Sequence, residues 1–115
     1  MTPIHSTAVV HPDAQIGERC EIGPYCVVGA NVVLGPGCKL HSHVVIDGHT
    51  VLGRENEIFP FASIGLKTQD LKWKGGVTRT AIGDRNTFRE YVTIHSATGD
   101  GEVTARVPNR GGGVE

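Results

Sequence analysis

The chain has 115 residues and a formal net charge of −1 at pH 7; hydrophobic residues make up 38% of it and aromatic residues only 5%. That length holds at most one domain, and the absence of a basic excess argues against a nucleic-acid partner. No apolar stretch approaches the roughly 20 residues of a membrane-spanning helix, and the first residues do not form a secretory signal. We therefore expect no transmembrane segment and a cytoplasmic protein.

An aliphatic residue recurs at every sixth position through the first half of the chain. The series comprises Ile4, Val10, Ile16, Ile22, Val28, Leu34, Leu40, Ile46, Leu52, Ile58 and Ile64. A period of six fits neither an amphipathic helix nor an alternating strand, and it is the signature of a hexapeptide solenoid. Three hexads make one coil, so that residues 18 apart stack as in a parallel sheet, with Leu34 between Ile16 and Leu52. The period predicts an all-β fold, a parallel β-helix of about five coils.

Two further columns follow the same period. A glycine comes directly after the aliphatic residue at Gly17, Gly23, Gly29, Gly35, Gly53, Gly65 and Gly83. We expect these glycines at corners whose backbone angles are open mainly to glycine. Cys20, Cys26 and Cys38 share a column of mostly small residues, two places before the aliphatic one. An odd number of cysteines argues against a disulfide framework, so we interpret them as small buried side chains, with zinc ligation as the alternative.

The period stops after Ile64. Residues 66–81 carry no hexad and contain three lysines and the tryptophan Trp73. Long loops are uncommon in compact folds and are often functional. We therefore predict one loop over residues 66–81 that protrudes from the solenoid.

The period returns for one more coil at Ile82, Phe88 and Ile94, and then polar residues and glycine occupy the aliphatic position. The segment that follows is rich in glycine and resembles low-complexity sequence in its composition. We predict a β-helix domain over residues 1–99 and a disordered tail over residues 100–115.

Several stretches together resemble the N-terminal part of the bacterial UDP-N-acetylglucosamine O-acyltransferases of lipid A biosynthesis, members of the hexapeptide-repeat acyltransferase superfamily. They are Ile22-Gly-Pro-Tyr-Cys-Val-Val-Gly29, Ser42-His-Val-Val-Ile-Asp-Gly-His-Thr50, Asn56-Glu-Ile-Phe-Pro-Phe-Ala-Ser-Ile-Gly65, Gln69-Asp-Leu-Lys72, and Ile82-Gly-Asp-Arg-Asn86 running on to Val92-Thr-Ile-His95. Hexads are shared by many acyltransferases, whereas the Gln-Asp-Leu-Lys loop between these coils is specific. The resemblance covers residues 3–99.

The resemblance implies a left-handed β-helix, an exception to the usual right-handed crossover, and a homotrimer with active sites between subunits. It implies transfer of a 3-hydroxyacyl chain from acyl carrier protein to the 3-hydroxyl of UDP-N-acetylglucosamine, the first step of lipid A biosynthesis. A histidine acts as general base, because a sugar hydroxyl is a poor nucleophile until a positioned base takes its proton. Neither a cofactor nor a metal is implied.

Carried over residue by residue, the resemblance implies that Gln69, Asp70, Lys72 and His95 bind substrate. Gln69 and Asp70 match loop residues that hold the nucleotide sugar, since amide and carboxylate groups hydrogen-bond to sugar hydroxyls. Lys72 matches a loop lysine near the acyl donor, where a cation suits phosphates or an anionic carrier protein. His95 matches a histidine that lines the cleft.

The general-base histidine of the family lies in a coil beyond the last residue of this sequence, and no catalytic residue is assigned. The chain is therefore expected to be a truncated form of the enzyme. The alternative is a non-catalytic nucleotide-sugar-binding or trimerisation remnant. His43 and His49 also belong to the family pattern, and we interpret them as wall and corner residues.

Other hexapeptide enzymes fit the sequence less well. A hexapeptide carbonic anhydrase needs three zinc-binding histidines that converge between subunits, and the histidines here do not show that arrangement. A small-substrate acetyltransferase would not explain the loop residues Gln69–Lys72. The related N-acyltransferase of the same pathway carries an additional N-terminal domain, whereas here the coils begin at Ile4.

Overall fold

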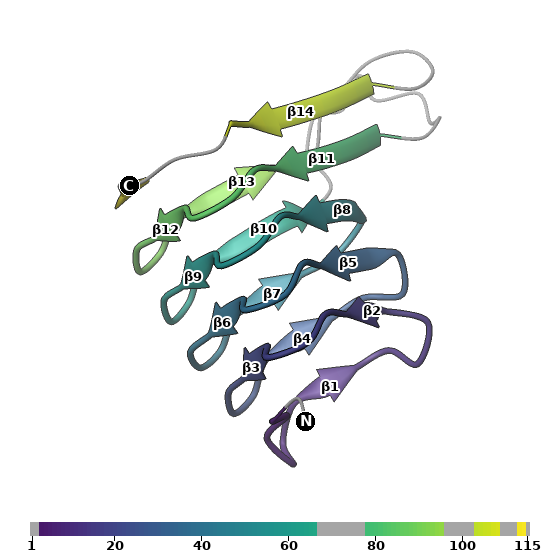
Figure 1. Cartoon of the computed structure of the whole chain (residues 1–115), viewed down its shortest axis with the longest axis vertical. Helices are drawn as coiled ribbons and strands as arrows, with labels where there is room; N and C mark the ends of the chain where they lie inside the picture. Colours follow the sequence, from purple (N-terminus) through teal and green to yellow (C-terminus); the bar gives the residue numbers. More distant parts are fainter. Residues whose placement is uncertain (1–2, 67–77, 96–102, 109–112, 115) are drawn as a thin grey trace.

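The protein is a left-handed parallel β-helix, as predicted (Figure 1). The structure, a computed structural model, describes residues 3–66, 78–95, 103–108 and 113–114. In that part of the chain there is no helix with the length and apolar character that a membrane span needs. The strands are β1 (Val9–Val10), β2 (Gln15–Ile16), β3 (Glu21–Ile22), β4 (Val27–Val28), β5 (Val32–Leu34), β6 (Lys39–Leu40), β7 (Val45–Ile46), β8 (His49–Leu52), β9 (Glu57–Ile58), β10 (Ser63–Leu66), β11 (Thr78–Ile82), β12 (Thr87–Phe88), β13 (Thr93–His95), β14 (Val103–Val107) and β15 (Gly113–Val114).

Every third strand belongs to the same sheet, which gives the prism three flat sides. Sheet 1 has the order β1-β4-β7-β10-β13, sheet 2 the order β2-β5-β8-β11-β14, and sheet 3 the order β3-β6-β9-β12-β15. In Figure 1 the coils stack from β1 at the bottom to β14 at the top. Neighbouring strands of a sheet pair in parallel, so each coil is hydrogen-bonded only to the coils directly above and below it.

The aliphatic series fills the interior, and the predicted stacking is confirmed. Leu34 pairs with Ile16 on one side and with Leu52 on the other. The largest stacked side chains of the core are Ile22, Val28, Leu34, Leu40, Ile46, Leu52, Ile58, Ile64, Ile82 and Phe88. Full burial of one such side chain is worth about 1.5–3 kcal/mol, so these columns are the main source of stability.

The cysteines are buried inside the prism, as interpreted, and none forms a disulfide. The Sγ of Cys20 donates to the carbonyl of Gly35 and the Sγ of Cys38 to that of Gly53, each at 3.1 Å. Burial raises the pKa of the Cys38 thiol to about 11. A thiol that stays protonated in this way is a poor metal ligand and a poor nucleophile.

The same interior column continues from the cysteines into two buried asparagines. The amide of Asn56 donates to the carbonyls of Gly53, at 3.1 Å, and Gly83, at 2.8 Å. Its oxygen accepts the backbone N–H of Asn86 at 2.9 Å. Each polar side chain in the column therefore satisfies backbone groups at the corner that joins sheets 2 and 3.

The segment 100–115 contains two strands, although the sequence predicts disorder there. β14 pairs with β11 and places Val107 opposite Ile82, while β15 pairs with β12 and places Val114 opposite Phe88. Val107 stands one place later, and Val114 two places later, than a strict count of six puts them, which is why the period misses this coil. The prediction of a disordered tail is wrong for both strands.

The predicted loop over residues 66–81 is too long at both ends. Leu66 is the last residue of β10, and β11 already begins at Thr78. Within β11, Thr80 and Ile82 are both buried, so this segment alternates with a period of two rather than six. Residues 67–77 lie outside the described residues.

The glycines after the aliphatic residues serve mainly to let coils approach closely. In this column only Gly65 has a positive φ, of 80°, among the described residues. A Cβ on Gly23 would lie 1.7 Å from the carbonyl oxygen of His41, and one on Gly35 would lie 2.6 Å from the backbone of Gly53. The expectation that these corners need unusual backbone angles is therefore wrong for most of them.

Candidate functional site

The connections from sheet 1 to sheet 2 lengthen in the last two coils. Ile16, Leu34 and Leu52 each follow the preceding aliphatic residue by six places, whereas Ile82 follows Ile64 by 18 and Val107 follows Ile94 by 13, through residues 67–77 and 96–102. The connections from sheet 3 to sheet 1 keep the same length throughout, at residues 23–26, 41–44, 59–62 and 89–92. We call the first the loop corner and the second the aromatic corner. Because insertions concentrate at functional surfaces of a rigid scaffold, the loop corner is the candidate site.

His95 lies at the base of the long insertion in the loop corner. It is the last residue of β13, and its backbone pairs with Leu66, the last residue of β10 before the insertion. The structure thus brings the backbone of His95 beside Leu66, the last described residue before residues 67–77. The other predicted site residues, Gln69, Asp70 and Lys72, lie outside the described residues.

The register across the insertion places two further residues with functional side chains on neighbouring strands at this corner. His49 begins β8 and is exposed, and its register partner on β11 is the half-buried Arg79. A guanidinium binds phosphate and carboxylate groups in a fixed, two-pronged geometry. Sequence reasoning missed Arg79, because its place opposite His49 becomes visible only once the register across the insertion is known.

The backbone of the loop corner is shaped by two glycines. Gly48 and Gly65 have φ values of 70° and 80°, which favour glycine. The Thr50 hydroxyl donates to the Asp47 carbonyl at 2.7 Å, and a Cβ on Gly65 would lie 2.0 Å from that hydroxyl oxygen. The register between β10 and β13 shifts at this same point. Such a bulge interrupts the regular pairing at the end of β10.

The aromatic corner is a column of stacked rings. Tyr25 stacks on His43 with ring centroids 5.1 Å apart, His43 on Phe61 at 5.0 Å, and Phe61 on Tyr91 at 5.4 Å. All four residues have a positive φ, between 55° and 67°. Since both faces of the His43 ring are covered, this histidine is a wall residue, as interpreted from the sequence.

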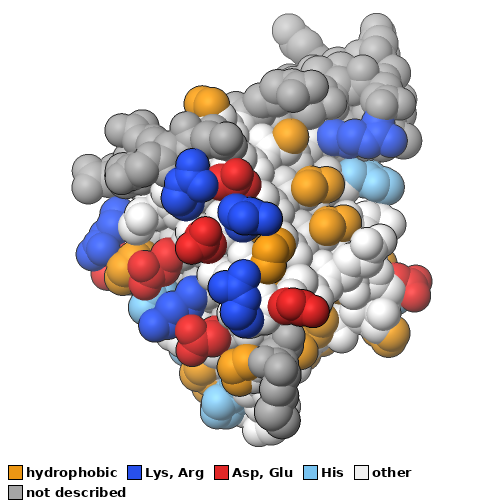
Figure 2. All heavy atoms as spheres, viewed as in Figure 1, with side chains coloured by type: hydrophobic (Ala, Val, Ile, Leu, Met, Phe, Trp, Pro, Cys, Tyr) orange, Lys and Arg blue, Asp and Glu red, His pale blue; other side chains and the backbone are white. Residues whose placement is uncertain are grey.

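The surface charges are mixed. On sheet 3, Glu21 is opposite Lys39, and Lys39 is opposite Glu57, so that neighbouring coils carry opposite charges in register. Figure 2 shows acidic and basic side chains interspersed over the face in view. Opposite charges across strands stabilise the pairing and hold its register. This face presents no field of one sign that would attract a nucleic acid.

Known proteins share both the repeat and the shape. The chain matches the family described as "Bacterial transferase hexapeptide (six repeats)" over residues 4–30 and 13–48. LpxA from Bacteroides fragilis, a UDP-N-acetylglucosamine acyltransferase, is 41% identical with a TM-score of 0.85, over 93% of this chain and 42% of that one. LpxA from Acinetobacter baumannii is 44% identical with a TM-score of 0.80, over 91% and 44%. The UDP-N-acetylglucosamine acyltransferase of Francisella novicida is 38% identical with a TM-score of 0.82, over 92% and 45%.

Coils, buried aliphatic columns and the matched repeat family together define a hexapeptide-repeat protein of the kind described as bacterial transferases. Within that class, identities of 38–44% over more than nine-tenths of the chain decide the family. The chain belongs to the UDP-N-acetylglucosamine acyltransferases. It spans less than half the length of the three relatives described above.

Proposed function

We propose that the protein serves the transfer of a 3-hydroxyacyl chain from acyl carrier protein to the 3-hydroxyl of UDP-N-acetylglucosamine, the first step of lipid A biosynthesis. The observation that carries this proposal is the 38–44% identity to acyltransferases that act on this sugar nucleotide. Because those relatives are enzymes, the match favours transfer over a non-catalytic binding or trimerisation element.

The loop corner is the proposed place for the sugar nucleotide. Gln69 and Asp70 would hydrogen-bond to sugar hydroxyls, and Lys72 would face phosphates or the acidic carrier protein. His95, whose backbone lies at the base of the insertion, would line the same cleft. Arg79, opposite His49 one coil below, adds a cation that suits the diphosphate.

The proposed reaction moves an acyl group from sulfur to oxygen. The sugar oxygen attacks the thioester carbonyl, a C–O bond forms, and the C–S bond to the carrier breaks. The hydroxyl proton passes to a general base and then to the departing thiolate. The residues of this chain that we assign bind and orient the substrates.

We further propose a cytoplasmic homotrimer with sites between subunits. The outer faces of the sheets support the assembly, since Val9 is 64% exposed on β1, Val27 is 40% exposed on β4, and Val51 is 50% exposed on β8. Exposed β-branched residues on flat parallel sheets suit packing against another copy. Sedimentation equilibrium is expected to give three times the mass of one chain, and a monomer at micromolar concentration would contradict the proposal.

Calorimetric titration with UDP-N-acetylglucosamine tests the binding step. We expect saturable binding, with weaker binding of UDP-glucose, which lacks the acetamido group. No binding, or equal binding of both sugars, would contradict the proposed substrate. Addition of 3-hydroxyacyl carrier protein then separates the two functions, because an acylated sugar nucleotide in the mass spectrum supports transfer, whereas binding without product supports the non-catalytic alternative.

A further inference from the structure

The strand β10 has one residue more than its partner strand β13 where the two meet at the loop corner. Ile64 pairs with Ile94 in the ordinary register. His95, the next residue of β13, pairs with Leu66 and not with Gly65. Gly65 has a φ of 80°, which is the left-handed conformation of the glycine in one class of β-bulge. Gly65 is therefore the extra residue of a bulge.

Gly65 also faces the interior of the prism. Ile64 and Gly65 are both buried, although successive residues of a strand point to opposite faces. Asp47 has the corresponding position in the coil below, because Ile46 pairs with Ile64, and Asp47 is exposed. The chain thus folds inward at Gly65 and not at the same position one coil earlier.

The turn of residues 47–50 forms the surface onto which Gly65 folds. The hydroxyl of Thr50 is buried and donates to the carbonyl of Asp47 at 2.7 Å, which closes this turn. A Cβ on Gly65 would overlap both the hydroxyl oxygen and that carbonyl oxygen, and a Cβ on Gly48 would overlap the carbonyl oxygen of Gly65. Gly65 therefore packs directly against the hydrogen bond between Thr50 and Asp47.

The preceding coil shows the same corner without this hydroxyl. Val32 has the position in β5 that Thr50 has in β8. Over the corner that leads to Val32, the register is regular, since the N–H of Gly29 donates to the carbonyl of Ile46 at 2.9 Å and Asp47 stays on the outside. In these two coils the bulge accompanies the threonine and is absent where the residue is valine.

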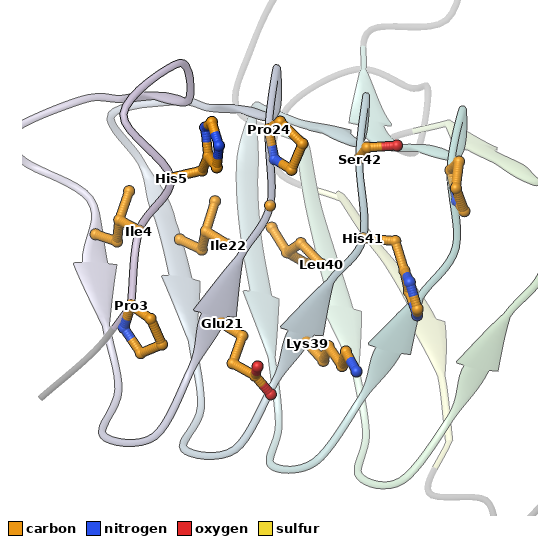
Figure 3. A pocket seen from close by; sticks show the side chains of 12 residues that line it. Pro3, Ile4, His5, Glu21, Ile22, Pro24, Lys39, Leu40, His41 and Ser42 are labelled. Carbon is orange, nitrogen blue, oxygen red and sulfur yellow. The ribbon is translucent and has the colours of Figure 1, made fainter.

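Thr50 is too deeply buried to contact a ligand itself, with an exposed fraction of 0%. A cavity of about 540 Å³ lies elsewhere, at β3 and β6, and its lining includes Glu21, Lys39 and His41 but no residue of the 47–50 turn (Figure 3). Any influence of Thr50 on binding must therefore pass through the backbone that it holds.

We propose that Thr50 is a positioning residue, whose hydroxyl holds the 47–50 turn against Gly65 so that the bulge places His95 beside Leu66. Without the bulge, His95 would pair with Gly65, and Leu66, from which residues 67–77 continue, would move one place away from it. A slip of one residue also exchanges the face to which side chains point. The effect on binding rests on the proposed function, because that function assigns His95 to the sugar-nucleotide site.

The first test determines the register by NMR without any ligand. We expect a backbone NOE between Leu66 and His95 in the wild type and in Thr50→Ser, which keeps the hydroxyl. Thr50→Val keeps the size of threonine but lacks the hydroxyl, and should show an NOE between Gly65 and His95 instead. Thr50→Ala, which is smaller, should show the same change if the valine variant does not fold. A Leu66–His95 NOE that persists without the hydroxyl would overturn the proposal.

Thr80→Val is the matched control for the loss of a buried hydroxyl. Thr80 pairs with Thr50 in the same column and is 1% exposed, and its hydroxyl has no hydrogen-bond partner within the part of the chain that the structure describes. This variant should keep the Leu66–His95 NOE. The same slip in the control would overturn the specific role of Thr50.

Calorimetric titration with UDP-N-acetylglucosamine then tests the consequence for binding. Thr50→Val is expected to bind about threefold to tenfold more weakly, in keeping with the loss of one hydrogen bond, while Thr50→Ser and Thr80→Val stay within about twofold of the wild type. A changed register with unchanged affinity would overturn the positioning role. If the wild type does not bind the sugar nucleotide, the proposed function fails, and the NOE comparison still decides whether Thr50 sets the register.

Discussion

The aromatic corner and the loop corner turn the same chain in the same coils, yet they are built differently. The aromatic corner has a constant length and stacks one ring on the next from Tyr25 to Tyr91. The loop corner contains Gly48 and Gly65, a register shift, and the insertion of residues 67–77. A repeating corner can be stabilised by its own neighbours, whereas a corner of changing length cannot. The difference indicates that one corner serves the fold and the other serves the ligand.

The aromatic corner also shows how bulky residues occupy left-handed backbone. Such a conformation costs roughly 1–2 kcal/mol for a residue with a side chain. A stacked aromatic pair stabilises the folded state by about 0.5–1.5 kcal/mol, and Phe61 takes part in two such pairs. The three stacked pairs therefore offset part of the backbone cost of the four left-handed residues Tyr25, His43, Phe61 and Tyr91.

The largest expected effect comes from filling the space at Gly65. Gly65→Ala would place a Cβ 2.0 Å from the Thr50 hydroxyl and 2.4 Å from the Asp47 carbonyl oxygen at a φ of 80°. We expect a loss of about 3 kcal/mol or more in unfolding free energy, measured by urea denaturation.

Gly37→Ala is the matched control for that substitution. Gly37 has a similar φ of 76°, but the nearest atom to its Cβ would be in the flexible side chain of Glu55, 3.1 Å away. This variant should lose only the left-handed penalty, about 1–2 kcal/mol. Equal losses in both variants would show that the loop corner is no more tightly packed than the others.

The next effect concerns ligand binding at the loop corner. Asp70→Ala removes a carboxylate proposed to hold the sugar hydroxyls, a hydrogen bond to a charged group worth about 1.5–3 kcal/mol. We expect UDP-N-acetylglucosamine to bind about 10-fold to 100-fold more weakly in calorimetry, with an unchanged melting temperature. A fall in melting temperature with unchanged affinity would assign Asp70 to the fold instead.

A substitution in the aromatic corner should lower stability without changing the affinity for the sugar nucleotide. Phe61→Ala removes two ring contacts but keeps a side chain at a φ of 67°, so we expect a loss of about 1–2 kcal/mol in unfolding free energy. Phe61→Gly should lose less, because glycine relieves the left-handed backbone. Affinity for the sugar nucleotide should not change in either variant, and a glycine variant less stable than the alanine variant would contradict the proposed balance.

The smallest effect tests the interior that both corners enclose. Burial raises the pKa of the Cys38 thiol from 9.0 to about 11, so the unfolded thiol ionises at a lower pH than the folded one. The stabilising contribution is complete below pH 9 and declines as the pH rises toward 11. Urea denaturation across this range should show a steeper decline for the wild type than for Cys38→Ala, and parallel curves would contradict the assignment.

The solenoid was predictable because a buried column tolerates few substitutions. Leu34 and Leu52 stand 18 residues apart in the sequence and pair in the structure. The same reasoning failed wherever the coil length changed. Val107 stands one place out of phase because of the preceding connection, and only its pairing with Ile82 shows that it belongs to the interior.

The candidate site was predictable only in part, for a related reason. His95 was assigned to the cleft from the resemblance alone, and the register between β10 and β13 puts its backbone beside Leu66, where the insertion begins. Arg79 could not be assigned to the site, since its partner His49 is separated from it by an insertion of unpredictable length. Where the six-residue repeat fixes which residues are neighbours, the neighbours can be predicted from the sequence. Where an insertion lies between two strands, the neighbours are known only once the strand register is known.

The most direct test compares one histidine from each corner in a single titration with UDP-N-acetylglucosamine. His95→Ala changes the loop corner, and His43→Ala changes the aromatic corner, where Tyr25 and Phe61 cover the ring. We expect His95→Ala to weaken binding about threefold to tenfold, in keeping with the loss of one hydrogen bond, and His43→Ala to leave the affinity unchanged. Weaker binding in His43→Ala with no change in His95→Ala would contradict the division of the coil into a structural corner and a binding corner.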